Sequence, residues 1–182
     1  MGILPTFTGI TYGPAITSSV KHGICYHCRM FRIVLVEPEI PPNTGNIIRL
    51  SANCGSTLHL IKPLGFDLSD KQLRRAGLDY HDLTHITVYD SLEECLAHAP
   101  PERIFACSTK GSRNYSGVRY QAGDTFIFGP ESRGLPGRFL RSLPEDAVIR
   151  IPMLEGRRSL NLSNAAAVIV YEAWRQNDFG KA

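Results

Sequence analysis

Short hydrophobic runs alternate with longer amphipathic segments from residue 30 to residue 176. The runs predict strands at Phe31–Val36, Thr57–Ile61, His85–Tyr89, Arg103–Ser108, Thr125–Phe128 and Ala147–Ile151. The amphipathic segments predict helices at Gly45–Asn53, Ser69–Ala76, Ser91–Ala99, Arg138–Ser142 and Ser163–Gln176. Strands separated by helices are typical of βαβ units. The pattern therefore predicts an α/β fold with a mostly parallel six-stranded sheet and helices on both faces.

Residues 1–29 show no such periodicity, and Met30 stands at the start of the first strand. We expect these 29 residues to be a non-native or disordered extension, and residues 30–182 to form a single domain. Cys25 and Cys28 form a CxxC pair, but the sequence has no second pair of that kind to complete a zinc site.

Three Gly- or Pro-punctuated loops follow predicted strands, at Glu37–Thr44, Gly129–Leu135 and Pro152–Gly156. Ligands of open α/β sheets bind beyond the carboxyl ends of the strands, so we expect a site where these loops gather. The prolines of the first loop predict an extended segment, with Asn43 or Thr44 capping the helix that follows. In the second loop, Gly134 permits a positive φ.

The third loop runs into Arg157–Asn164, where two Ser and two Asn precede an apolar helix. One N-cap needs one such residue, so four suggest that this stretch also binds a ligand. The alternative is a generously capped, buried C-terminal helix.

Several kinds of chemistry lack their sequence signals. The chain has no GxGxxG after a strand, no GxxxxGK[ST] and no HExxH, and its apolar runs are shorter than a membrane span. Ser132 does not stand in a GxSxG motif. Five cysteines, an odd number, indicate reduced thiols and a cytoplasmic protein. What remains is a site of backbone groups, Asn, Ser and Arg, with no metal expected.

The basic residues concentrate in the second half of the chain. Residues 101–182 carry 12 basic and 8 acidic residues, whereas residues 30–100 carry 6 basic and 9 acidic ones. Of the 20 basic residues, 15 are Arg, whose planar fork matches phosphate oxygens. This balance is compatible with nucleic-acid binding, although charge alone favours an ordinary solvated surface.

Three motifs in order resemble those of the SPOUT methyltransferases: Asn43–Arg49 (NTGNIIR), Phe128–Leu135 (FGPESRGL) and Ser159–Asn164 (SLNLSN). With Glu37–Asn46 (EPEIPPNTGN) and Arg74–Tyr80 (RRAGLDY), the chain is most similar to the short members that methylate the ribose 2′-hydroxyl of the wobble cytidine or uridine in tRNA. The resemblance implies a deep trefoil knot at about residues 103–176 and S-adenosyl-L-methionine as methyl donor, with S-adenosyl-L-homocysteine as the product.

The resemblance also implies roles for particular residues. Arg49 is the implied catalytic residue, acting as a base or as an electrostatic orienter; the alternative is an ion pair with Glu37 or Glu39. The implied cofactor-binding residues are Cys107, Ser108, Gly129, Glu131, Ile151, Met153, Ser159 and Leu160. The implied substrate-binding residues are Arg158, Asn161 and Tyr171, although a Tyr on an apolar helix is more often in a core or an interface.

The partners implied are the tRNA anticodon stem-loop and a second copy of the chain. The last helix carries Val168, Ile169 and Trp174, which would be exposed unless a partner covers them, so we expect a homodimer through this helix. Candidate phosphate contacts are Arg113, Arg119, Arg133, Arg138 and Arg158. We expect the loop Lys110–Gly117 to be mobile and to close on the substrate.

Two other functions are compatible with the sequence. One is a non-catalytic RNA-binding protein that retains the SPOUT fold, and the other is a flavodoxin-like nucleotide binder with no role on RNA. Intact Arg49, Gly129, Ser159 and Asn161 favour the enzyme.

Overall fold

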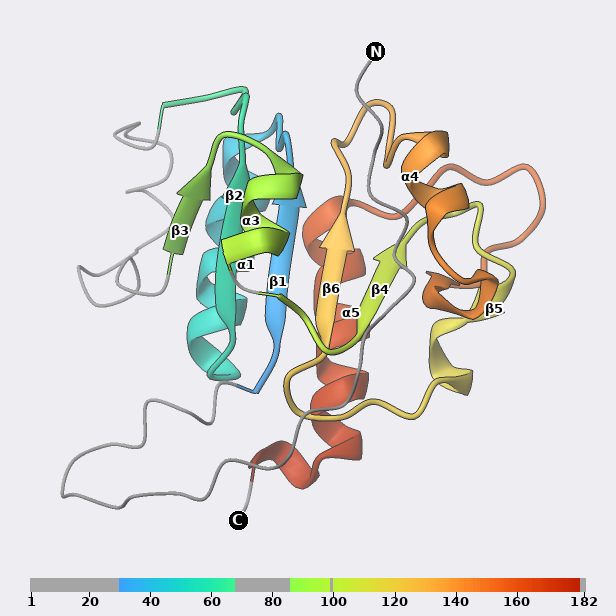
Figure 1. Cartoon of the computed structure of the whole chain (residues 1–182). Helices are drawn as coiled ribbons and strands as arrows, with labels where there is room; N and C mark the ends of the chain where they lie inside the picture. The colour runs from blue at the N-terminus through green and yellow to red at the C-terminus, as the bar shows by residue number, and fades with distance from the viewer. Residues whose placement is uncertain (1–29, 68–85, 99, 181–182) are drawn as a thin grey trace, which may run out of the picture.

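A computed structural model describes residues 30–67, 86–98 and 100–180 (Figure 1). Its strands are β1 (Arg32–Val36), β2 (Thr57–Ile61), β3 (Ile86–Tyr89), β4 (Ile104–Cys107), β5 (Arg113–Asn114), β6 (Thr125–Phe128) and β7 (Val148–Arg150). Its α-helices are α1 (Pro41–Asn53), α3 (Leu92–His98), α4 (Gly137–Ser142) and α5 (Leu162–Gln176). Short 3₁₀ turns are η2 (Tyr115–Gly117), η3 (Glu145–Ala147) and η4 (Asp178–Gly180).

The strands form one sheet in the order β3-β2-β1-β6-β4-β7-β5, and each pairing within it is parallel. Figure 1 shows α1 and α5 side by side on one face and α3 on the other. The predicted α/β class, the parallel sheet and the helices on both faces are thus confirmed. The predicted count of six strands omitted β5, which at two residues is too short to produce a hydrophobic pattern.

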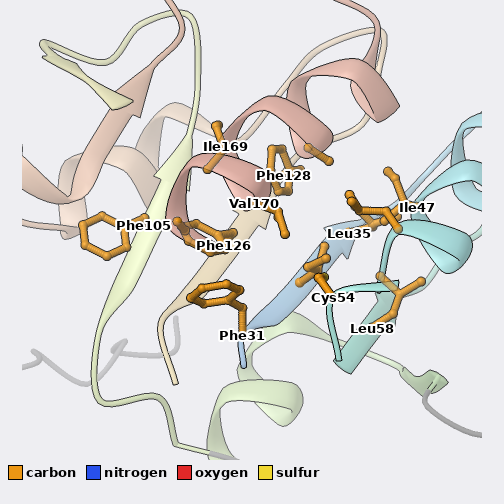
Figure 2. Close-up of a cluster of buried hydrophobic side chains, with 14 of the residues drawn as sticks. Phe31, Leu35, Ile47, Cys54, Leu58, Phe105, Phe126, Phe128, Ile169 and Val170 are labelled. Atoms are coloured by element: carbon orange, nitrogen blue, oxygen red, sulfur yellow. The ribbon is translucent and has the colours of Figure 1, made fainter. Parts of the chain in front are cut away.

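Alternation along the strands divides the core into two layers. Ile33 and Leu35 of β1 pack with α1 and α5, whereas Val34 and Val36 face the layer that contains α3 and α4. Side chains of a strand point alternately to opposite faces, which is why an unbroken apolar run fills both layers. Figure 2 shows the larger layer, where Phe126 lies among side chains from several elements.

Helix α1 begins earlier than the sequence predicted. It starts at Pro41 rather than Gly45, its N-cap is Ile40, and no side chain caps its first amide groups. The expected extended loop and the expected cap at Asn43 or Thr44 were therefore wrong. Proline is accepted in the first turn of a helix, because the N–H that it lacks has no partner there. Asn43, only 4% exposed, is thereby released for another contact.

Helix α5 buries one face against α1 and the sheet. Ile169 is 1% exposed within the single chain, so its predicted place in a surface patch was wrong. Val168 is 37% exposed and Trp174 is partly buried. The apolar surface of this helix is therefore narrower than expected, and it includes Tyr171, which is 44% exposed.

Some expectations concern residues outside the described ranges. They include the 1–29 extension with its CxxC pair, the helix at Ser69–Ala76, and the motif Arg74–Tyr80. The trefoil knot stays a prediction of the family resemblance. Among the described residues, no helix combines the length and apolarity needed to cross a membrane, and no cluster of three or more His, Cys, Asp or Glu is placed to hold a metal ion.

Candidate functional site

A cavity of about 440 Å³ opens beyond the carboxyl ends of β4, β6 and β7. All eight residues that the sequence assigned to a cofactor line it: Cys107, Ser108, Gly129, Glu131, Ile151, Met153, Ser159 and Leu160. Asn161, assigned to the substrate, lines it too. Parallel strands end at the same edge of a sheet, so loops far apart in the sequence meet there. The volume lies within the range of small-molecule sites, about 300–1,000 Å³.

A hydrogen-bonded relay crosses the cavity wall from α5 to the loop after β6. Asn161 caps α5 by accepting from the amides of Ser163 and Asn164 through Oδ1, and its Nδ2 donates to Oδ1 of Asn43 at 2.8 Å. The Nδ2 of Asn43 donates to Oε1 of Glu131 at 2.9 Å. The Ser/Asn stretch thus caps α5 through Oδ1 of Asn161 and also forms part of the cavity wall through Nδ2 of the same side chain.

The two loops beside the relay exchange hydrogen bonds in both directions. The Glu131 carboxylate accepts from the amides of Glu39 and Ile40, at 2.8 and 3.3 Å. The Glu39 carboxylate accepts from the amide and the hydroxyl of Ser132, at 2.9 and 2.7 Å. These bonds, with the Arg133 charge as a smaller contribution, lower the pKa of Glu39 below its ordinary value. Each loop therefore holds the other in the shape that forms the cavity.

Backbone packing fixes the loop after β6. Gly134 has a φ of +66°, as the sequence predicted. A Cβ added to Gly129 would lie 2.3 Å from the backbone nitrogen of Leu135. Such a separation is far inside van der Waals contact, so the loop folds back on itself only because residue 129 has no side chain.

Apart from Lys110, Glu131 and Arg133, the side chains that line the cavity are neutral. Burial raises the pKa of Cys107 well above its ordinary value, so this thiol is uncharged at neutral pH. Backbone amides and carbonyls of the three loops supply donors and acceptors suited to a heterocycle. The lining therefore suits an uncharged ring system more than a polyphosphate.

Three predicted residues do not line the cavity. Arg49 is exposed on α1, six residues after Asn43 and hence less than two turns away. Arg158 is exposed in the loop before α5. Tyr171 packs edge-to-face on Trp174, with ring centroids 5.5 Å apart. Arg49 and Arg158 are exposed outside this lining, whereas Tyr171 lies with Val168 on the exposed apolar strip of α5.

The candidate phosphate contacts are all arginines, but some of them are already ion-paired with carboxylates of the protein. Arg133 is ion-paired with both Glu37 and Glu39, and Arg113 pairs with Asp146 and donates to the carbonyl of Gly117. Arg119, Arg138 and Arg158 are exposed, and the described residues give their guanidinium groups no carboxylate partner. These last three therefore remain the stronger candidates.

The loop from Lys110 to Gly117 is paired with β7, and its expected mobility stays a prediction. Arg113 and Asn114 form β5 and pair with β7, and Asn114 accepts a hydrogen bond from Nε of Arg150 at 3.4 Å. A Cβ on Gly111 would lie 2.7 Å from the carbonyl oxygen of Val148, which shows how closely the two backbones approach. Closure of this loop on a substrate stays untested.

Asn43 and Lys110 are among the lining residues that sequence reasoning did not assign to the site. Asn43 was assigned to a helix cap, although its place in the first motif was a signal that it belonged to the site. Lys110 lines the cavity but was considered only as part of a loop. Its position two residues after Ser108, at the end of a strand, was the available signal.

The fold and the cavity define an α/β protein with a small-molecule site built by the loops of its own parallel sheet. Residues 30–171 match the model of the SpoU rRNA Methylase family, and the chain belongs to that family. This confirms the resemblance seen in the three motifs.

Relatives and solved structures support the same grouping. The tRNA (cytidine(34)-2'-O)-methyltransferase of Methylovorus glucosotrophus is 57% identical over 153 residues, covering 84% of this chain and 99% of the relative. A solved structure concerned with "2-OH methylation of C/U34 on tRNA" is 43% identical with a TM-score of 0.75, covering 82% of this chain and 97% of the other. An AdoMet-bound rRNA methyltransferase from Sinorhizobium meliloti is 25% identical with a TM-score of 0.68, covering 80% of this chain and 56% of the other.

Proposed function

We propose that this protein transfers a methyl group from S-adenosyl-L-methionine to the ribose 2′-hydroxyl of the wobble cytidine or uridine of tRNA. The observation that carries the proposal is the cavity whose walls come from the three motif loops. Support comes from a relative of that activity, which is 57% identical over 99% of its own length.

The lining fits the methyl donor. Ile151 and Met153 offer backbone groups to its adenine, Cys107 and Ser108 flank one edge, and Ser159 and Leu160 close the cavity. When bound, the donor supplies an activated methyl group on a sulfonium sulfur. Gly129 and Glu131 form the remaining wall, and Glu131 stays in place because three donors hold its carboxylate.

Arg49 is our proposed catalytic residue. A guanidinium keeps its proton at any physiological pH and is a poor base. We therefore assign it to binding the phosphate beside the target ribose and to stabilising negative charge on the 2′-oxygen as the proton leaves. Arg158 and Asn161 hold the substrate at the mouth of the cavity. The protein's main contribution is orientation, because the methyl group is already activated.

The proposed assembly is a homodimer formed through α5, with each anticodon stem-loop touching both copies. Val168 and Tyr171 on this helix, and Leu160 just before it, are each 37–44% exposed, and a partner would remove this apolar surface from water. We assign Tyr171 to that interface, beside the RNA. We place the protein in the cytoplasm, which suits the free, buried thiols of Cys54 and Cys95.

The deciding experiment measures transfer of a labelled methyl group to tRNA from cells lacking this protein, followed by mass spectrometry of the wobble nucleosides. The expected result is that label appears only on the ribose of the wobble nucleotide of the tRNA. A protein that binds tRNA but transfers no methyl group would overturn the assignment and favour a non-catalytic RNA-binding protein. Label on a base, or elsewhere in the tRNA, would also contradict it.

A further inference from the structure

A second cavity, of about 400 Å³, lies next to the first and shares Lys110 with it. It is lined by α4, the start of β7 and the loop after β4. Figure 1 shows α4 near the end of β4 from which this loop leaves. None of the residue roles considered so far uses it. A ligand that reaches across Lys110 would occupy both cavities at once.

The lining of this second cavity combines an apolar floor with a charged rim. Leu140, Leu143 and Val148 provide the floor. Lys110 and Arg141 provide two cations, and Glu145 adds one carboxylate. An apolar surface beside cations suits a ligand that carries both a flat ring and an anionic group, which is the composition of a nucleotide.

The two cations are not committed to other groups. Within the described part of the chain, the Lys110 ammonium and the Arg141 guanidinium have no ion pair and no hydrogen bond, although Arg141 lies over Gly137, with NH1 3.2 Å from where a Cβ would stand. Arg133 at the first cavity is held by Glu37 and Glu39. Phosphate would therefore gain more from Lys110 and Arg141 than from Arg133.

We propose that the second cavity binds the nucleotide adjacent to the methylated one, with its base on Leu140 and Leu143 and the connecting phosphate on Lys110 and Arg141. This inference rests on the proposed function, because the target ribose must stand at the first cavity. Continuity favours RNA over a separate small molecule: one polynucleotide strand passes from one cavity to the other over Lys110. Glu145 can accept from an exocyclic amino group of the bound base.

The test compares three variants of the full-length protein on an RNA stem-loop carrying the target. Arg141→Ala removes a rim charge, and Ser112→Phe places a ring in the cavity without changing charge. Lys62→Ala is the control, because Lys62 is an exposed cation that pairs with Asp90 and lines neither cavity. Each protein is also assayed with RNAs that lack the base on the 5′ or the 3′ side of the target.

We expect Arg141→Ala and Ser112→Phe to raise KM for the RNA about tenfold, with kcat and the affinity for the methyl donor unchanged. One of the two base deletions should raise KM by a similar factor in the wild type and in Lys62→Ala. The same deletion should have little further effect in Arg141→Ala and Ser112→Phe, because the subsite is already lost.

Two results would overturn the subsite. One is equal sensitivity to base deletion in all four proteins, and the other is equal KM for Arg141→Ala and Lys62→Ala with no effect of Ser112→Phe. Either would leave the proposed function intact, since the wild type would still methylate the intact stem-loop. Failure of the wild type to methylate any of the RNAs would instead reject the proposed function, and the subsite with it.

Discussion

Asn161 donates a hydrogen bond of 2.8 Å to Asn43, which precedes it by 118 residues. Each of the two side-chain amides also makes a second contact, because Asn161 caps α5 and Asn43 donates to Glu131. The pair therefore joins the two helices that pack on one face of the sheet to the loop after β6. Through it, the position of α1, which carries Arg49, depends on the walls of the cavity.

Replacing Asn43 by Ala should destabilise both the fold and the site. The side chain is 4% exposed, and its loss leaves one acceptor on Glu131 and one donor on Asn161 without their partner. We expect the free energy of unfolding to fall by about 1–3 kcal/mol and the donor to bind more weakly. Urea denaturation and calorimetric titration measure the two effects. Asn46→Ala, at an exposed position of the same helix, is the control and should change neither.

Replacing Gly129 by Ala should impair the cavity much more than replacing Gly117. An alanine Cβ at 129 would lie 2.3 Å from the Leu135 nitrogen, whereas one at 117 meets nothing within 4 Å. The loop after β6 must move to make room for the alanine side chain at position 129. We therefore expect the affinity for the methyl donor to fall more than about tenfold. Unchanged affinity in Gly129→Ala would show that this loop does not shape the binding site.

The contact between Glu39 and Ser132 should weaken in acid. Its hydrogen bonds lower the pKa of Glu39 below the ordinary 4.5, so the folded protein holds this proton more weakly than the unfolded chain does. The stabilisation is complete above pH 4.5 and is lost as the pH falls through the lowered pKa. Glu39→Gln should be less stable than the wild type at pH 7, and the gap should narrow below pH 4.5. Thermal unfolding from pH 7 to pH 3 measures it; a gap independent of pH would contradict the assignment.

Replacing Arg49 by Ala should slow methyl transfer strongly while leaving donor binding intact. The residue lies outside the cavity lining, so donor affinity should stay within about twofold. Removing a group that stabilises developing charge typically lowers kcat about 10²–10³-fold. Arg49→Lys separates charge from geometry, because Lys keeps the charge but loses the planar fork. Equal loss of kcat and of donor affinity would place Arg49 in the cofactor site instead.

Placing a charge on the exposed strip of α5 should separate the proposed dimer. Val168→Asp puts a carboxylate into an apolar surface, and a symmetric interface receives it once from each copy. We expect self-association to weaken by about 100-fold or more, seen as monomer in analytical ultracentrifugation at micromolar concentration. Ala122→Asp adds the same charge in the exposed loop before β6 and should leave the mass unchanged. A monomeric wild type would refute the interface.

Sequence periodicity was sufficient for the sheet because β1, β2 and β6 are buried on both faces and are mostly apolar in sequence. It was insufficient for α1, where proline was taken as a helix breaker although the first turn accepts it. β5 was missed because two residues are too few to show a hydrophobic pattern. Its position depends instead on the close backbone packing at Gly111.

Motif resemblance brought the cavity residues together, but it could not show how their side chains pair. The relay from Asn161 through Asn43 to Glu131 depends on distances that only the folded chain defines. The same holds for Arg133, whose charge looked available in the sequence and is ion-paired in the structure. Long-range pairing of this kind leaves no local signal.

The last wall of the cavity begins at Ser159, near the end of the chain. The cavity can therefore be completed only late in synthesis of the polypeptide. A nascent polypeptide that has emerged from the ribosome only as far as Arg150 has its whole sheet but lacks the turn and the cap that close the donor site. Under the proposed function, products that end before Ser159 would therefore lack this wall and would bind the donor more weakly than the finished chain.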